Sequence, residues 1–336
     1  MNKNIVGIIG LGRIGKLHFD NIINYQGVEI RYVFDAFATD LNDYLKDYPN
    51  VKVVKDYEEI LNDKEVNVVF VCTPTTTHSE IIIKAANAGK NIFCEKPISF
   101  SEEETLSAYE AVEKANVKFQ IGFNRRFDKN FMDAKKAILD NKIGELHILN
   151  ITSRDPEPPN LDYVKKSGGI FMDMSIHDFD MIRFISSSDV EEVYVNGAAL
   201  VNPDIAKVDD IDTALISLKL KNKAIGSIDN SRQAVYGYDQ RLEAFGNLGK
   251  VNVKNNLQDN ICIANSDSVM SAKPQWFFLE RYKEAYILET KLFFEAVSNN
   301  KETCPNFLDG IKAQKIAKAA KASLISGKPE IVENVD

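Results

Sequence analysis

Asp173, His177 and Asp180 lie in the most apolar helical stretch of the chain, SGGIFMDMSIHDFDMIRF at residues 167–184. Asp173, His177 and Asp180 recur at i, i+4 and i+7, which places them within about 60° of arc on an α-helix. Charges on a largely buried helix are costly unless they are paired, bound to a metal ion or used in chemistry. A histidine beside carboxylates suits proton transfer, because an unperturbed imidazole titrates at about pH 6.5.

Two other interpretations of this stripe stay open. Asp173 and His177 are compatible with a satisfied pair inside a hydrophobic core. The stripe is also compatible with a metal site, but no second histidine is near and the H-x-x-x-H spacing is missing, so we expect no metal. His18, on a predicted helix, and His147, on a predicted strand, are expected to be structural.

A glycine motif lies near the N-terminus, in IVGIIGLGRIGKLHFDNI. Gly10, Gly12 and Gly15 form G-x-G-x-x-G between an apolar strand and a helix. Gly10 allows the tight turn, Gly12 lets a pyrophosphate approach the backbone, and Gly15 lets helix and strand pack closely. The helix N-terminus adds free N–H groups and partial positive charge, so the motif predicts a dinucleotide site.

Asp35 indicates which dinucleotide is bound. It ends the second predicted strand, twenty residues after Gly15. A carboxylate there accepts hydrogen bonds from ribose hydroxyls and repels a 2′-phosphate. Ala36 and Phe37 follow it and supply no positive charge, so the pattern favours NAD over NADP. The alternative is a plain glycine turn with a solvated aspartate.

A lysine follows the fifth predicted strand, in the tetrapeptide CEKP. This is the edge at which open α/β sheets bind ligands. Pro97 removes a backbone donor and stiffens the exit, so Lys96 can project into the crevice. An enzyme that uses a nicotinamide needs a group to move the alcohol proton while hydride goes to the ring. The alternative for Lys96 is a surface lysine at a turn.

The order of elements predicts an α/β fold in two domains. Up to about residue 124, short β-rich runs alternate with helices, as in a doubly wound parallel sheet. Ser101 with Glu104 predicts a capping box, and Gly89 a helix C-terminus. The later elements are expected at 129–141, 145–155, 167–184, 190–265 (five or six strands, with a hairpin at Asn222-Lys223), 278–299 and 308–326. We predict a Rossmann domain over 1–122 and an α+β domain with a largely antiparallel open sheet over 123–336.

Composition narrows the class of protein. The 336 residues carry a formal net charge of −8, and 44% of them are hydrophobic. An acidic, globular composition argues against nucleic acid or an acidic membrane as the main partner. The four cysteines are scattered, and neither a signal segment nor an apolar run of membrane-spanning length is present. We therefore expect a cytoplasmic protein without disulfide bonds.

The motifs together resemble the Gfo/Idh/MocA oxidoreductase family over essentially the whole chain. They are G-x-G-x-x-G, E-K-P and G-G-x-x-x-D-x-x-x-H-D. The stretches TSRDPEPPNLDYVKKSGGIFMDMSIHDFDMIRF and NSRQAVYGYDQRLEAFG are similar to those of its bacterial inositol 2-dehydrogenases. The resemblance implies NAD-dependent oxidation of a cyclic polyol, with myo-inositol to 2-keto-myo-inositol as the leading reaction. It also implies a homo-oligomer, a tetramer or a dimer.

The resemblance assigns roles residue by residue. His177 is implied as the general base, Lys96 as the hydrogen-bond donor to the reacting oxygen, and Asp173 as the partner of the lysine. The residues implied for NAD are Gly10, Gly12, Arg13, Ile14, Gly15, Asp35, Thr73, Pro74, His78, Glu95, Lys96 and Asn124. Those implied for the polyol are Lys96, Arg126, Asp155, Asp173, His177, Asp180 and Tyr238.

Substrate identity stays open at this point. Scyllo-inositol or a pyranose would fit the same motifs, and a non-catalytic nucleotide-sensing regulator is an alternative of another class, although Lys96 and His177 are both present. Some inositol dehydrogenases carry a histidine in the loop after the first strand of the second domain. This chain has Arg154-Asp155 there, with no histidine between His147 and His177.

Overall fold

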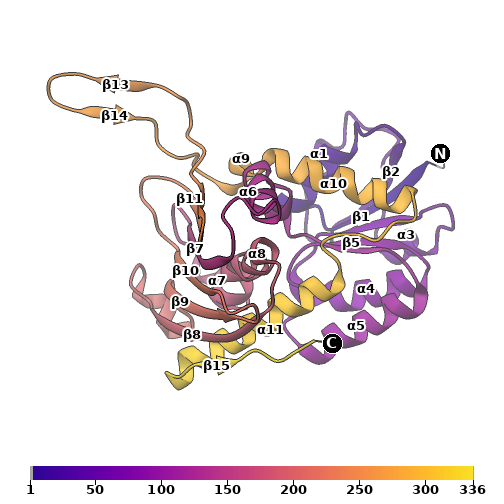
Figure 1. Ribbon diagram of the computed structural model, residues 1–336. Helices are drawn as coiled ribbons and strands as arrows, with labels where there is room; N and C mark the ends of the chain where they lie inside the picture. Colours follow the sequence, from indigo (N-terminus) through magenta and orange to yellow (C-terminus); the bar gives the residue numbers. More distant parts are fainter. Residues whose placement is uncertain (1–2, 336) are drawn as a thin grey trace. The chain divides into compact units, whose positions relative to one another are not determined.

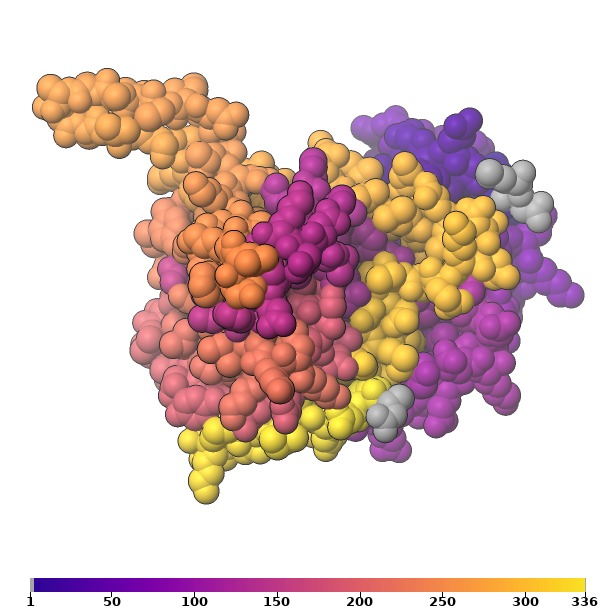
Figure 2. Space-filling model, viewed as in Figure 1, coloured from indigo at the N-terminus to yellow at the C-terminus, as the bar shows by residue number. Residues whose placement is uncertain are grey.

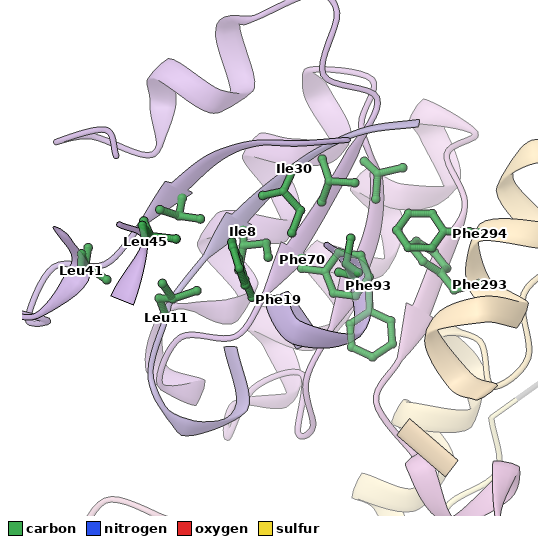
Figure 3. Packing of buried hydrophobic residues seen from close by; sticks show 14 residues of the cluster. Ile8, Leu11, Phe19, Ile30, Leu41, Leu45, Phe70, Phe93, Phe293 and Phe294 are labelled. Carbon is green, nitrogen blue, oxygen red and sulfur yellow. The ribbon is translucent and has the colours of Figure 1, made fainter. Parts of the chain in front are cut away.

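The computed structural model describes residues 3–335, which fall into two compact units. The first comprises the chain up to Asn124 together with Tyr286–Ile311, and the second comprises Arg125–Ala285 together with the chain from Lys312 onward. The predicted division after residue 122 differs from this at Tyr286–Ile311, which belongs to the first unit. The reason is hydrophobic packing, because Phe293 and Phe294 lie in the core of the first unit (Figure 3).

A six-stranded parallel sheet, ordered β3-β2-β1-β4-β5-β6, forms the first unit. Figure 1 labels its strands β1, β2 and β5. Its strands are β1 (Asn4–Ile9), β2 (Val28–Phe34), β3 (Lys52–Val53), β4 (Val68–Val71), β5 (Asn91–Cys94) and β6 (Phe119–Ile121). Its helices are α1 (Arg13–Ile22), α2 (Leu41–Tyr44), α3 (Glu58–Asn62), α4 (His78–Asn87), α5 (Glu102–Ala115) and most of α10 (Lys283–Ser298). Because the strand order reverses between β1 and β4, the predicted doubly wound Rossmann fold is confirmed.

Aromatic rings fill the core of this unit. Phe70 of β4 stacks on Phe93 of β5, with ring centroids 4.7 Å apart. Phe293 of α10 meets both rings, at 5.7 Å from each. All four residues of β4 are buried, as expected for a strand that is covered on both faces.

Helix ends follow the predicted signals with one difference. Gly89 has a φ of 70° directly after the C-cap residue of α4, a conformation that glycine adopts without strain. The Ser101 hydroxyl accepts the Glu104 N–H at the start of α5, at 3.3 Å. The Glu104 carboxylate, however, accepts from the Ser99 hydroxyl, so only half of the predicted capping box forms.

A seven-stranded mixed sheet, ordered β12-β11-β7-β10-β9-β8-β15, organises the second unit. Its strands are β7 (Leu146–Arg154), β8 (Val190–Ala198), β9 (Thr213–Leu220), β10 (Ile225–Ser231), β11 (Asp239–Gly246), β12 (Gly249–Val253) and β15 (Glu330–Ile331). Only β7 and β10 pair in parallel, so the predicted, largely antiparallel sheet is confirmed. Its helices are α6 (Lys129–Leu139), α7 (Leu161–Val164), α8 (Ile176–Ser186), α9 (Phe278–Arg281) and most of α11 (Phe307–Ser326). The helix expected over 278–299 is therefore divided into α9 and α10.

Helix α8 is the apolar stretch of the sequence, and it packs on the sheet of its unit. Ile176, Phe179 and Ile185 are completely buried. Ile182 lies over β10, where a Cβ on Gly226 would come within 3.4 Å of its side chain. The prediction of one α-helix over 167–184 is wrong at its start, because Phe171–Ser175 form a π-helical turn before α8 begins.

Strands β13 (Cys262–Ala264) and β14 (Val269–Ser271) form a separate hairpin. Figure 2 shows it in orange, extending away from the rest of its unit. Every residue of both strands is exposed. Of the helices among residues 3–335, none is both long and apolar enough to cross a membrane.

Candidate active site

The predicted NAD-binding residues collect at one edge of the parallel sheet. Gly10 follows β1, Asp35 follows β2, Thr73 follows β4, Lys96 follows β5 and Asn124 follows β6. The carboxyl ends of parallel strands share an edge, and ligands of open α/β sheets bind there, at the switch point in strand order. The sheet order places this switch point between β1 and β4.

The glycine loop has the shape that a dinucleotide requires. Gly10 has a φ of 95°, and a Cβ on it would come within 2.7 Å of the backbone at Cys72 and Thr73. A Cβ on Gly15 would meet the Gly10 carbonyl oxygen at 2.0 Å, so this glycine permits the close turn. A Cβ on Gly12 would meet nothing within 4 Å, which leaves open space where a pyrophosphate would lie.

Helix α1 begins at this open space with Arg13, Ile14 and Gly15. No side chain caps its N-terminus, and its first turn contains no acidic residue. The free N–H groups and the positive end of the helix dipole therefore suit a phosphate group. The residues present fit NAD.

Asp35 is held rigidly by the backbone. Its Oδ2 atom accepts the Leu11 N–H of the glycine loop at 2.7 Å, and its Oδ1 atom accepts the N–H groups of Phe37 and Ala38 at 2.8 and 2.9 Å. Each carboxylate oxygen has two lone pairs, so these bonds leave acceptor capacity for ribose hydroxyls. The carboxylate also joins the loops after β1 and β2.

His78 joins two loops rather than presenting a free ring. Its Nε2 atom lies 2.7 Å from the Thr73 carbonyl oxygen and its Nδ1 atom 2.8 Å from that of Pro97. Burial lowers its pKa, despite these two contacts, and favours a neutral ring that donates through one nitrogen. The contact between His78 and NAD stays a prediction. The residue is almost fully buried and positions the loops that carry Thr73-Pro74 and Lys96-Pro97.

Glu95 and Lys96 share the loop after β5 but differ in surroundings. The Glu95 Oε1 atom lies 2.7 Å from the Nε2 atom of His18, which is completely buried on α1. Gly122 makes room for this carboxylate, since a Cβ there would meet Glu95 Oε2 at 2.9 Å. Glu95 thus connects β5 to α1, and the Lys96 side chain next to it is partly exposed at the ligand-binding edge.

In the second unit, Asp173 belongs to the π-helical turn and His177 to the first turn of α8. Both are partly exposed, whereas most of α8 is buried. A π turn places fewer degrees between successive residues than an α turn does, so Asp173 is rotated from the position that α-helical spacing predicts. Such turns recur at functional sites.

Asp155, after β7, lies close to Asp173. Burial raises its pKa to about 6; Arg232 lowers it and the Asp173 charge raises it further. Tyr238 precedes β11 and is buried, and burial raises the pKa of its hydroxyl well above the ordinary value. Its ring meets Tyr282 edge-on at 6.0 Å.

Arg126 and Asp180, both predicted polyol ligands, bind each other. Arg126 Nε donates to Asp180 Oδ2 at 2.8 Å and Nη2 to Oδ1 at 2.6 Å. Asp180 is 1% exposed. Asp180 thus forms a buried, bidentate ion pair that joins the segment before α6 to α8, and its contact with the polyol stays a prediction.

Sequence reasoning missed several residues of this region. Arg125 forms a second buried ion pair, with Asp178 at 2.5 Å. Arg232 and Tyr163 bind Asp173. Arg232 stands in NSRQAVYGYDQR, a stretch already singled out by resemblance, but nothing in its spacing pointed to Asp173. Within residues 3–335, no three His, Cys, Asp or Glu side chains are grouped to hold a metal ion.

Both parts of the chain match known protein families. A family described as "Oxidoreductase family, NAD-binding Rossmann fold" matches residues 5–123, and a family described as "GFO/IDH/MocA C-terminal domain" matches residues 131–252. The two matches lie in the two predicted domains.

Curated relatives match over almost their whole length. Uncharacterized oxidoreductase YrbE of Bacillus subtilis is 49% identical, over 100% of this chain and 99% of its own. Myo-inositol 2-dehydrogenase of Thermotoga maritima is 42% identical over 98% and 99%. Scyllo-inositol 2-dehydrogenase (NAD(+)) of Bacillus subtilis is 34% identical over 96% and 94%.

Solved structures have the same fold. A probable dehydrogenase from Thermotoga maritima superposes with a TM-score of 0.95 at 41% identity, over 99% of this chain and 100% of that one. Scyllo-inositol dehydrogenase from Lactobacillus casei, solved with NAD(H) and scyllo-inositol, gives 0.91 at 28% identity, over 98% and 99%.

Proposed function

The chain belongs to the Gfo/Idh/MocA oxidoreductase family and is an NAD-dependent oxidoreductase acting on CH–OH groups; we propose that its substrate is myo-inositol, oxidised to 2-keto-myo-inositol. The observation that carries this proposal is the full-length similarity to myo-inositol 2-dehydrogenase together with the presence of Lys96, Asp173 and His177. A regulator without catalysis would not need these three residues.

Each residue has a distinct chemical task in this proposal. His177 takes the proton of the reacting hydroxyl as general base, since a neutral imidazole accepts a proton near neutral pH. Lys96 donates a hydrogen bond to the same oxygen and stabilises negative charge as it develops. Asp173 offsets the ammonium charge of Lys96. NAD supplies the hydride acceptor when bound, at the edge that carries the glycine loop and Asp35.

A second candidate substrate is scyllo-inositol. The scyllo-inositol 2-dehydrogenase of Bacillus subtilis is also more than 30% identical to this chain over nearly its full length. The two inositols differ only in the orientation of one hydroxyl group. Discrimination between them therefore depends on the hydrogen-bonding groups around that hydroxyl.

Absorbance at 340 nm tests the proposal directly. Purified protein is mixed with NAD and with myo-inositol, scyllo-inositol, glucose or a linear polyol, and kcat/KM is measured for each. We expect myo-inositol to give the highest kcat/KM. A higher kcat/KM with scyllo-inositol would make scyllo-inositol the preferred candidate. If no cyclic polyol yields NADH, the proposed function is refuted.

A further inference from the structure

A buried arginine and a tyrosine hold both oxygens of Asp173. The Arg232 guanidinium, after β10, donates from Nη1 to Asp173 Oδ2 at 2.9 Å. The Tyr163 hydroxyl, on α7, donates to Asp173 Oδ1 at 2.8 Å. Two elements that are distant in sequence thus reach one carboxylate from its two sides.

Arg232 stands among acidic groups. Its side chain is 4% exposed, and its Nη1 atom lies 3.7 Å from Asp155 Oδ2 as well as 2.9 Å from Asp173. Burial alone would lower its pKa, but the charges of Asp173, Asp155 and Asp210 raise it above the ordinary value. The guanidinium therefore stays charged beside the Asp173 carboxylate.

The backbone beneath Asp173 is fixed by the same cluster. Asp210 Oδ1 accepts the Ile170 N–H at 3.0 Å, one residue before the π-helical turn that contains Asp173. Gly169 has a φ of 81°, and a Cβ on it would meet that Asp210 oxygen at 2.9 Å. Arg232 and Asp210 thus restrain the side chain and the main chain of one short turn.

We propose that Arg232 and Tyr163 are positioning residues for Asp173, which fix the orientation of its carboxylate for the oxidation step. The inference rests on the proposed function, in which Asp173 offsets the charge of Lys96. Each oxygen of Asp173 gives one lone pair to Arg232 or Tyr163, and its other lone pairs are thereby aimed in fixed directions. A carboxylate in a fixed direction costs no reorganisation during the reaction.

Kinetics of matched variants tests this positioning. Arg232→Gln should lower kcat about 10- to 100-fold, and Tyr163→Phe about tenfold, as expected for hydrogen bonds to a charged group, while KM for NAD stays unchanged. Arg232→Lys should recover part of the loss. Arg232→Gln combined with Asp173→Asn should be no slower than Asp173→Asn alone, because the two act through one group.

Two control variants remove the same kinds of interaction, an arginine ion pair and a tyrosine hydrogen bond, at sites away from Asp173. Arg241→Gln breaks an arginine pair with Asp239, and Tyr194→Phe removes a hydroxyl that donates to Asn196; both should keep wild-type kcat. Tyr163 is 49% exposed, so its Phe variant should fold even if Arg232→Gln does not. Wild-type kcat in both Tyr163→Phe and Arg232→Lys, or fully multiplicative losses in the double variant, would overturn the proposal.

Failure of the proposed function gives a different result. In that case the wild type produces no NADH from any cyclic polyol. The pairing is then judged by a double-mutant cycle in urea unfolding between Arg232→Gln and Asp173→Asn. Coupling between the two substitutions supports the pairing, and additive effects overturn it.

Discussion

At the residue scale, three backbone hydrogen bonds hold the Asp35 carboxylate, and we expect this carboxylate to favour NAD over NADP. The backbone fixes its carboxylate at the end of β2, so a 2′-phosphate there would meet a negative charge, and the next two residues, Ala36 and Phe37, carry no positive charge. We expect kcat/KM for NAD to exceed that for NADP by more than about tenfold, and Asp35→Ser to reduce the ratio. Asp43→Ser, on the exposed side of α2, should leave it unchanged. Equal use of both cofactors by the wild type would contradict this prediction.

Lys96 and His177 act on the transition state in the proposed mechanism. His177→Ala should lower kcat by about 10²–10⁴-fold, the usual contribution of a general base, with little change in NAD affinity. Lys96→Ala should be at least as severe, because it also removes the charge that Asp173 offsets. His147→Ala is the control. His147 is exposed on β7, and within residues 3–335 its ring meets one other aromatic ring, that of Phe245. Near wild-type turnover of His177→Ala would exclude it from the chemistry.

At the scale of elements, the Arg126–Asp180 pair anchors α8. Asp180→Asn keeps the shape of the side chain but leaves a buried guanidinium without its counter-charge, which costs about 3–5 kcal/mol. Urea unfolding should show this loss. Asp140→Asn breaks an exposed pair with Lys136 and should change stability little. Unchanged stability together with a raised KM for the polyol would instead indicate that Asp180 binds the polyol.

A buried glutamate on α10 should make stability depend on pH. Glu289 is completely buried, neither carboxylate oxygen has a hydrogen-bond partner among the described residues, and burial and then the Glu95 charge raise its pKa well above the ordinary value. The unfolded chain releases the Glu289 proton above about pH 4.3, whereas the raised pKa makes the folded chain retain it to a higher pH. Stability from this group is full at low pH and falls as pH rises toward the folded pKa.

Glu289→Gln has no such proton to lose. The difference between the Tm of this variant and the Tm of the wild type should therefore increase from pH 5 to pH 8, whatever its value at pH 5. Scanning calorimetry measures both proteins, and Glu284→Gln, on the exposed side of α10, serves as the control. A Tm difference that does not vary with pH would show that Glu289 is ionised in the folded state.

Elements were predictable where a local pattern decides them. Alternating strands and helices gave the parallel sheet, and the apolar sides of α8 are buried as predicted. The π turn at Asp173 was not predictable, because α-helical periodicity assumes one spacing throughout. The pairs of Arg125 with Asp178 and of Arg126 with Asp180 escaped prediction for another reason: each arginine lies more than 50 residues before its aspartate, and pairing over such distances depends on the folded backbone.

At the scale of the whole molecule, the open sheet of the second unit predicts assembly. Its outer face carries exposed apolar residues on three strands: Leu215 at 55%, Ile225 at 52% and Phe245 at 42%. Exposed apolar residues on a sheet face are typical of an interface between subunits. We expect light scattering to show a tetramer or a dimer, and Leu215→Lys with Ile225→Lys to shift it toward smaller species. A wild-type monomer of 37.8 kDa at micromolar concentration would contradict this.

The interrupted first unit affects the order of folding during synthesis. The ribosome completes the six strands of the parallel sheet by residue 121, but Phe293 and Phe294 of the same core are translated about 170 residues later. Until they emerge, the nascent sheet lacks the rings that cover Phe70 and Phe93. Domains often fold in the order of their synthesis. Here the unit that begins at the N-terminus cannot be completed before strands β7 to β12 of the second unit have left the ribosome.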